Sequence, residues 1–76
     1  MHSLGTKIMK DVINAKKILY EIIKNNRGSD LETISDEYSK KASVSFDSIM
    51  FVLIKNDFVK PCNNGWEVTE KQVDWT

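Results

Sequence analysis

The stretch SFDSIMFVLIKN, residues 45–56, decides how this chain folds. It contains six consecutive apolar residues, from Ile49 to Ile54. Such a run suits either a strand buried on both faces or a helix in the protein interior. In a strand, alternate residues from 49 to 53 share one face. In a helix, Ile49 and Leu53 share one side with Asn56, and the opposite side carries the following residues: Asp47, Ser48, Phe51 and Lys55.

The flanking residues favour the helix over the central strand. The segment begins with serines, and either Ser43 or Ser45 suits the N-cap, with Asp47 in the first turn. Asn56-Asp57 is a typical helix end, and the pattern is long for a strand. We therefore expect a helix over about 43–56.

The apolar residues of this helix would divide between two partners. Ile49, Leu53 and Val52 would pack against two preceding helices, and Met50 and Ile54 would lie beneath the segment that follows. The pattern leaves the partner of Phe51 open.

Two helices are predicted upstream. Residues 6–25 place apolar groups, including Ile8 and Leu19, at helical spacing, and the Lys residues lie mostly outside that stripe. The sequence NNRG then ends the helix, because Gly28 suits a C-terminal cap. Ser29 and Glu32 form a predicted capping box for a short second helix, whose apolar stripe is as follows: Leu31, Ile34 and Tyr38. SKKAS then reads as a turn.

After residue 57, the spacing of apolar residues changes from that of a helix to that of a strand. Residues 58–62 and 66–69 read as two strands joined through Asn63-Asn64-Gly65, since Asn-Gly is a strong hairpin signal and both residue types accept positive φ. Pro61 makes its strand an edge or ends the regular pairing. Residues 69–72 resemble a second capping box, which predicts one helical turn, with Val73 or Trp75 docking on the core.

The composition indicates one globular domain, residues 1–76. The chain has 76 residues, 41% of them hydrophobic, and a formal net charge of zero, which disfavours non-specific polyanion binding. Basic residues concentrate in 1–29 and 38–62 and acids in 30–37, so one surface can be positive. One cysteine, Cys62, and no long apolar segment predict a cytoplasmic protein without a membrane span.

The order of elements resembles the winged helix-turn-helix family of DNA-binding regulators, and more narrowly the small regulators of archaeal viruses and plasmids. The resemblance runs from ILYEIIKNNRGSDLETISDEYSKKASVSFDSI through LIKNDFVKPCNNGWEVT, about residues 18–69. The passage from recognition helix to wing appears as Leu53 to Val59. Asp57 stands where the family usually has Gly, and Asp tolerates the left-handed conformation better than most residues. The third helix is also about one turn shorter than usual, or the preceding turn longer.

The resemblance implies an α+β fold, three helices and a two-stranded β-hairpin wing, acting as a sequence-specific, double-stranded DNA-binding transcription regulator. The third helix would enter the major groove, and the wing would contact the backbone or minor groove. It implies a homodimer on DNA and autoregulation of the regulator's own promoter. The candidate DNA-binding residues are Arg27, Lys40, Lys41, Ser43, Ser45, Asp47, Ser48, Phe51, Lys55, Lys60, Asn63 and Asn64.

Other functions have weaker support in the sequence. His2 is the single histidine and lies in the N-terminal tail, and Cys62 has no histidine near it in the sequence, so we expect no enzyme. No metal, cofactor or small-molecule site is evident. The alternative function is a winged-helix protein-protein interaction module without specific DNA binding. The dimer surface stays open between the N-terminal helix and the C-terminal residues with Trp75.

Overall fold

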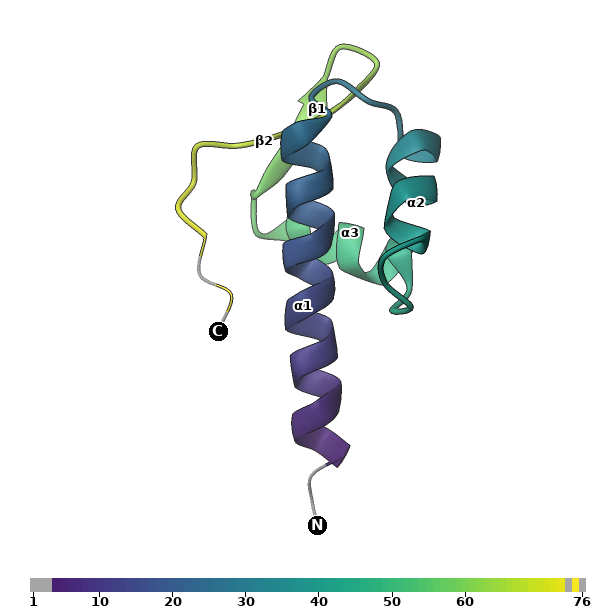
Figure 1. The fold of residues 1–76 in the computed structure, drawn as a ribbon. Helices are drawn as coiled ribbons and strands as arrows, with labels where there is room; N and C mark the ends of the chain where they lie inside the picture. The colour runs from purple at the N-terminus through teal and green to yellow at the C-terminus, as the bar shows by residue number, and fades with distance from the viewer. Residues whose placement is uncertain (1–3, 74, 76) are drawn as a thin grey trace.

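Three helices are followed by a two-stranded antiparallel hairpin, in an α+β layout that matches a winged helix (Figure 1). The structure is a computed structural model that describes residues 4–73 and 75, with side chains described from residue 10 onward. The elements are α1 (Leu4–Asn25), α2 (Leu31–Ser39), α3 (Phe46–Lys55), β1 (Val59–Cys62) and β2 (Gly65–Val68). Within the described residues, no helix is long and apolar enough to cross a membrane. The predicted fold class is therefore confirmed.

The first helix begins two residues before the predicted boundary and ends where the sequence predicts. Its buried side includes Leu19 and Ile23, both fully inaccessible to solvent. At the C-terminal end, Asn26 Nδ2 donates a hydrogen bond to the Ile22 carbonyl at 2.8 Å. Gly28 then takes a φ of +86°, a conformation that glycine adopts without steric cost. The predicted apolar stripe is confirmed from residue 12 onward, and Ile8 lies outside the described side chains.

The second helix has a different N-cap from the predicted one. Asp30, rather than Ser29, occupies this position, and its Oδ1 accepts a hydrogen bond from the Thr33 backbone N–H at 2.9 Å. This bond satisfies one of the free N–H groups of the first turn. Leu31 remains 45% exposed, so the buried stripe of α2 contains only Ile34 and Tyr38, with nothing from the first turn. The predicted stripe was wrong by one residue.

Residues 46–55 form a helix, which settles the helix-or-strand alternative. Two terminal bonds end α3: the Asp57 N–H donates to the Ile54 carbonyl at 3.0 Å, and the Phe58 N–H donates to the Leu53 carbonyl at 2.9 Å. This pair of bonds is the Schellman ending, which needs a left-handed residue between helix and exit. Asp57 takes that role with a φ of +61°, as predicted.

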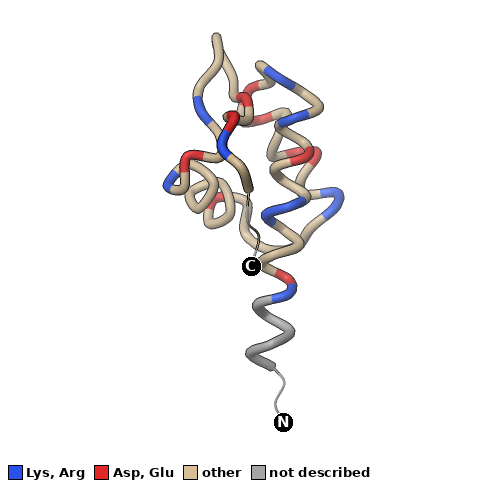
Figure 2. Tube along the Cα trace, turned by 90° about the vertical axis from the view of Figure 1, so that its left-hand side faces the viewer, with Lys and Arg blue, Asp and Glu red and all other residues tan. Residues whose placement is uncertain are grey.

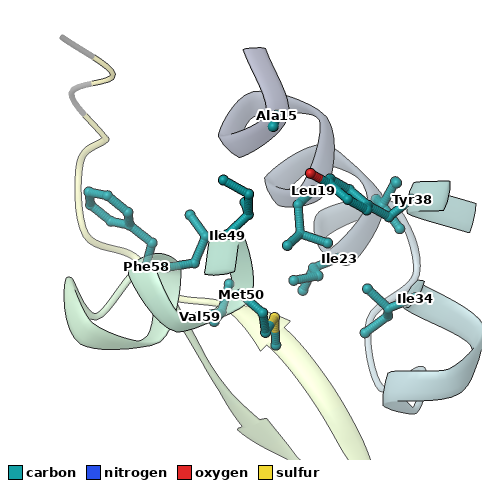
Figure 3. Close-up of a cluster of buried hydrophobic side chains, with 11 residues drawn as sticks. Ala15, Leu19, Ile23, Ile34, Tyr38, Ile49, Met50, Phe58 and Val59 are labelled. Carbon is teal, nitrogen blue, oxygen red and sulfur yellow. The ribbon is translucent and has the colours of Figure 1, made fainter. Parts of the chain in front are cut away.

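The core lies where α1, α2, α3 and the start of the hairpin meet (Figure 3). Ile49 and Leu53 of α3 are buried as predicted, and Val52 is half-buried. Met50 is also buried, and Figure 3 shows it close to Val59 of β1. Ile54 was predicted beneath the hairpin, but it remains 39% exposed. Ile54 therefore lies at the margin of the core-facing side of α3, partly covered by the protein and partly open to solvent.

The hairpin forms at the predicted place with a different turn. Cys62 pairs with Gly65, so the connection has two residues, Asn63 and Asn64, instead of the predicted three, and Gly65 belongs to β2. Asn63 has the positive φ, +56°, and Gly65 begins β2 without one. A Cβ atom on Gly65 would collide with the backbone carbonyl oxygens of Gly28 and Ser29. Glycine is needed there for close backbone approach, not for turn geometry.

The loop between α1 and α2 holds the hairpin against the helices. Trp66 of β2 accepts a hydrogen bond from the Gly28 N–H at 2.8 Å and donates one to the Ser29 carbonyl at 3.1 Å. Since the Trp66 backbone bonds to this loop, its partner Pro61 on β1 needs no N–H to satisfy it. β1 is thus an edge strand, as predicted, and its pairing continues past Pro61 to Cys62.

Among the described C-terminal residues, 69–73 and 75, the predicted helical turn is absent, but the segment docks on the core. The Thr69 hydroxyl donates to the Asp57 carbonyl at 2.6 Å and accepts from the Lys71 N–H at 3.3 Å, and Glu70 and Lys71 form bends. The hydroxyl thus braces a turn instead of capping a helix. Trp75 packs edge-on against Tyr20 and Phe58, with ring centroids 5.4 and 5.8 Å apart, so the predicted docking is confirmed.

Candidate nucleic-acid interface

The outer side of α3 carries an exposed stripe of mixed chemistry. We use the name outer stripe for five residues of α3 that are all exposed: Asp47, Ser48, Phe51, Ile54 and Lys55. Phe51 is 63% exposed and lies in the middle, with Ser48 one turn before it and Lys55 one turn after it. The structure therefore brings four predicted site residues together, and it adds Ile54 to them.

The turn before α3 is held by a bond from the second helix. Tyr38 is buried, and its hydroxyl donates to the Val44 carbonyl at 2.7 Å. Burial of this phenol raises the pKa of Tyr38, which further favours the neutral form that donates this bond. Ser43 and Ser45 on either side are exposed. Ser45 occupies the N-cap position of α3 but makes no side-chain cap bond, which leaves its hydroxyl available to a ligand.

The two lysines of the turn lie in different surroundings. Lys40 Nζ lies 3.8 Å from Asp36 and 3.7 Å from Glu37, and both are surface pairs of small energetic weight. Lys41 lines an open groove between α1 and α2 that also contains Lys17. The structure thus places Lys41 beside α1, and Lys40 beside the acids of α2.

The hairpin supplies the next predicted residues. Asn63 and Asn64 are both exposed at its tip. Lys60 on β1 is exposed, with its Nζ 3.8 Å from Glu67 on β2. An ammonium group and two amides on one short hairpin can donate hydrogen bonds to phosphate oxygens or to base edges in a minor groove.

Arg27 has a partner within the protein. Its Nε donates to Glu67 Oε1 at 2.7 Å, which joins the α1–α2 loop to β2. The hydrogen bond from the Arg27 guanidinium lowers the pKa of the Glu67 carboxyl, and the positive charges of Arg27 and Lys60 lower it further. The same bond raises the pKa of Arg27. Arg27 was predicted to reach a phosphate, and in the folded chain this guanidinium braces the hairpin.

Lys71 is a cation that the sequence patterns did not single out. Its Nζ donates to the Asn56 carbonyl at 2.7 Å, at the C-terminal end of α3, and lies 5.3 Å from the centroid of the Phe58 ring. The bond compensates the partial negative charge of this helix end. Residues 56 and 71 are far apart in sequence, so no local pattern signals this contact.

Charges of both signs are mixed over the surface. Figure 2 shows basic segments on both sides of the molecule, interleaved with acidic ones. The segregation of charge along the sequence therefore does not produce a single basic face. Among the described residues, no three His, Cys, Asp or Glu side chains are arranged to hold a metal ion.

A scan against models of protein families found no match to this chain, and comparisons with curated proteins and with solved structures found no significant match.

Proposed function

We propose that the protein is a sequence-specific regulator of transcription that binds double-stranded DNA, with α3 in the major groove and the hairpin on the backbone or minor groove. The observation that carries the proposal is the outer stripe of α3. It presents an acceptor, a hydroxyl, an aromatic ring and an ammonium group along one side of a helix whose other side is buried. In a helix-turn-helix protein, side chains on such a helix face contact base edges.

The packing around α3 supports this role. Tyr38 holds the turn between α2 and α3, and Ile49 and Leu53 seat α3 in the core. Base recognition needs side chains on a rigid element, and α3 meets this requirement. The hairpin places Asn63 and Asn64 at an exposed tip, where a second set of DNA contacts is expected.

The proposal includes a homodimer, with α1 as the contact surface between two copies. Figure 1 shows that the first turns of α1 stand clear of the other elements. The C-terminal alternative has less support, because Trp75 packs within its own chain against Tyr20 and Phe58. We further propose that the protein acts in the cytoplasm as a regulator of its own promoter, as the resemblance to regulators of small replicons implies. Light scattering over a range of concentrations tests the dimer, and a strict monomer both free and on DNA contradicts it.

Selection from a pool of random double-stranded DNA tests the central claim. The full chain is incubated with the pool at about 50 mM salt, where phosphate contacts are strong. We expect enrichment of one motif, bound at least about a thousandfold more tightly than unselected DNA. If repeated rounds enrich no motif above non-specific binding, the protein is not a sequence-specific DNA-binding regulator.

A second candidate function is a protein-interaction module with the same fold. The observation in its favour is the acidic character of α2, which precedes α3 and carries Glu32, Asp36 and Glu37 without a basic residue. These carboxylates repel phosphates, and net charge is zero. Co-purification followed by titration against the purified partner, combined with a negative DNA selection, would support this function over the first.

A further inference from the structure

Phe51 lies exposed on α3, whereas other apolar side chains of that helix are buried in the core. It is 63% exposed, whereas Ile49 and Leu53 are buried. The aromatic pairs among the described side chains join Tyr20, Phe58 and Trp75, or Tyr38 and Phe46, and Phe51 belongs to none of them. Ile54, one turn further on, is 39% exposed. The fold therefore leaves two adjacent apolar groups facing outward.

The outer stripe lacks the side chains that make the common bidentate base contacts. Arg or Lys pairs with guanine, and Asn or Gln pairs with adenine, through two hydrogen bonds in the major groove. The ten residues of α3 contain no Arg, Asn or Gln, and its one lysine, Lys55, lies at the C-terminal end. In the first turn of α3, hydrogen bonds to base edges are thus limited to Asp47 and Ser48. The Asp47 carboxylate can accept from a cytosine amino group, and the Ser48 hydroxyl bonds to bases without strong preference.

The major groove offers one apolar group, the 5-methyl of thymine. A ten-residue helix is about 15 Å long, enough to lie along about four base pairs. Phe51 lies near the middle of that length. Resting on the proposed DNA-binding function, we infer that α3 recognises its site through thymine methyl groups, which Phe51 and Ile54 cover. The ligand class is major-groove DNA that is rich in thymine at the positions facing this stripe.

The charge around the stripe favours DNA over an apolar protein surface. Lys55 lies on the stripe, and Lys71 is held at the C-terminal end of α3 by its bond to the Asn56 carbonyl. Two cations therefore lie at the end of the helix that carries Phe51 and Ile54, where they can contact the phosphates that flank a groove.

Replacement of thymine by uracil tests the inference, because uracil lacks only the 5-methyl group. The duplex obtained by selection is synthesised with deoxyuridine at single thymidine positions, and the dissociation constant is measured by fluorescence anisotropy. We expect about fourfold weaker binding for each covered methyl, the factor expected for burial of one group of this size. Positions outside the contact should show no effect and serve as controls.

Variants of the protein identify the side chain that contacts the methyl group. In Phe51→Ala the ratio of the dissociation constants for the uracil and thymine duplexes should fall to about one at the positions that Phe51 contacts. In Phe51→Leu this ratio should fall only in part. Since Phe51 is exposed, both variants should keep the wild-type melting temperature, which circular dichroism checks. The exposed Gln72→Ala variant in the C-terminal segment is the matched control and should keep the full ratio of dissociation constants.

The possible failures are distinguishable. If selection enriches no DNA, the proposed function fails, and the inference falls with it. If a motif is enriched but every uracil substitution leaves the affinity unchanged, the inference is wrong while the function stands. Uracil effects that all persist in both Phe51→Ala and Ile54→Ala assign methyl recognition to another residue and also overturn the inference. Self-association that Phe51→Ala abolishes, without DNA binding, would make the stripe a protein interface.

Discussion

At the scale of single residues, the lack of a side chain at Gly65 allows β2 to lie directly against the loop between α1 and α2. The Gly65 Cα lies against the carbonyl oxygens of Gly28 and Ser29, where a Cβ atom has no space. The two backbone hydrogen bonds between Trp66 and this loop depend on this close approach of β2 to the loop. The wing is therefore positioned by a backbone contact, which every side chain larger than hydrogen would disrupt.

Substitution at Gly65 should therefore be far more damaging than at Gly28. We expect Gly65→Ala to lower the free energy of unfolding by about 3 kcal/mol or more, because the hairpin must separate from the loop. A Cβ atom on Gly28 would have no heavy atom within 4 Å. Gly28→Ala should therefore lower the free energy of unfolding only by the strain of its left-handed φ, about 1–2 kcal/mol. Urea denaturation of both variants measures the difference, and equal losses would contradict this account.

Asp57 carries a strain that glycine would relieve. It occupies the left-handed position of the ending of α3 with a φ of +61°, and its side chain makes none of the hydrogen bonds of that ending. We expect Asp57→Gly to raise the free energy of unfolding by about 1 kcal/mol, and Asp57→Ala to lower it by a smaller amount. Urea denaturation again gives the values. A loss of stability in Asp57→Gly would show that the carboxylate has a stabilising role.

At the scale of elements, the pair of Arg27 and Glu67 joins the α1–α2 loop to the wing, and its strength should depend on pH. The Arg27 bond lowers the pKa of Glu67 below its ordinary value of 4.5. A group whose pKa is lowered in the folded state contributes stability above its unfolded pKa, and this contribution disappears as pH falls through the folded pKa. The stabilisation is thus complete at neutral pH and lost in acid.

Melting temperatures of wild type and Arg27→Met between pH 7 and about pH 3 check this dependence. We expect the wild type to be the more stable at pH 7, and the difference between the two to shrink below pH 4.5. The pKa of Asp30 is also lowered, by its bond to the Thr33 N–H. Because Asp30 is present in both the wild type and Arg27→Met, its titration does not change the difference in stability between them. Lys24→Met, on an exposed position of α1, is the control and should show a difference that does not vary in this range.

At the scale of the whole molecule, the C-terminal segment completes a core that the helices alone leave open. Trp75 packs between Tyr20 of α1 and Phe58 at the start of the wing. It thus connects the first helix to the end of α3 through side chains. A small chain has little apolar area to bury, so each aromatic contact carries a large share of its stability.

Removal of Trp75 should therefore lower stability throughout the molecule. The ring is half-buried, so we expect Trp75→Ala to cost about 2 kcal/mol, less than a fully buried aromatic residue. For a chain of this size the melting temperature should fall by about 10 °C. Gln72→Ala, at an exposed position of the same segment, should leave it unchanged, and differential scanning calorimetry compares the two. An unchanged melting temperature for Trp75→Ala would mean that the segment is not docked in solution.

The salt dependence of the proposed DNA binding is a property of the whole molecule, because the basic groups come from several elements. If four phosphates are contacted, the plot of log affinity against log salt concentration should have a slope of about −4 per protomer. Lys55→Ala should reduce the magnitude of this slope by about one. Lys17→Ala, in the groove between α1 and α2, should leave it unchanged. A slope near zero would exclude phosphate contacts as the source of affinity.

The sequence alone determined the elements of this protein and the two sides of α3. Apolar spacing identified the buried Ile49 and Leu53 and the exposed Phe51, and the left-handed tolerance of Asp57 predicted the helix end. These features depend on residues within a few positions of one another. Local periodicity and local hydrogen bonds therefore suffice to predict them.

The tertiary structure decided the features that depend on distant residues. The pairing of Arg27 with Glu67, the bond from Lys71 to the end of α3 and the close approach at Gly65 each join segments more than ten residues apart. The exposure of Ile54 likewise follows from where the hairpin lies against α3. No spacing in the chain encodes such contacts, because they arise only when the helices and the hairpin pack around a shared core.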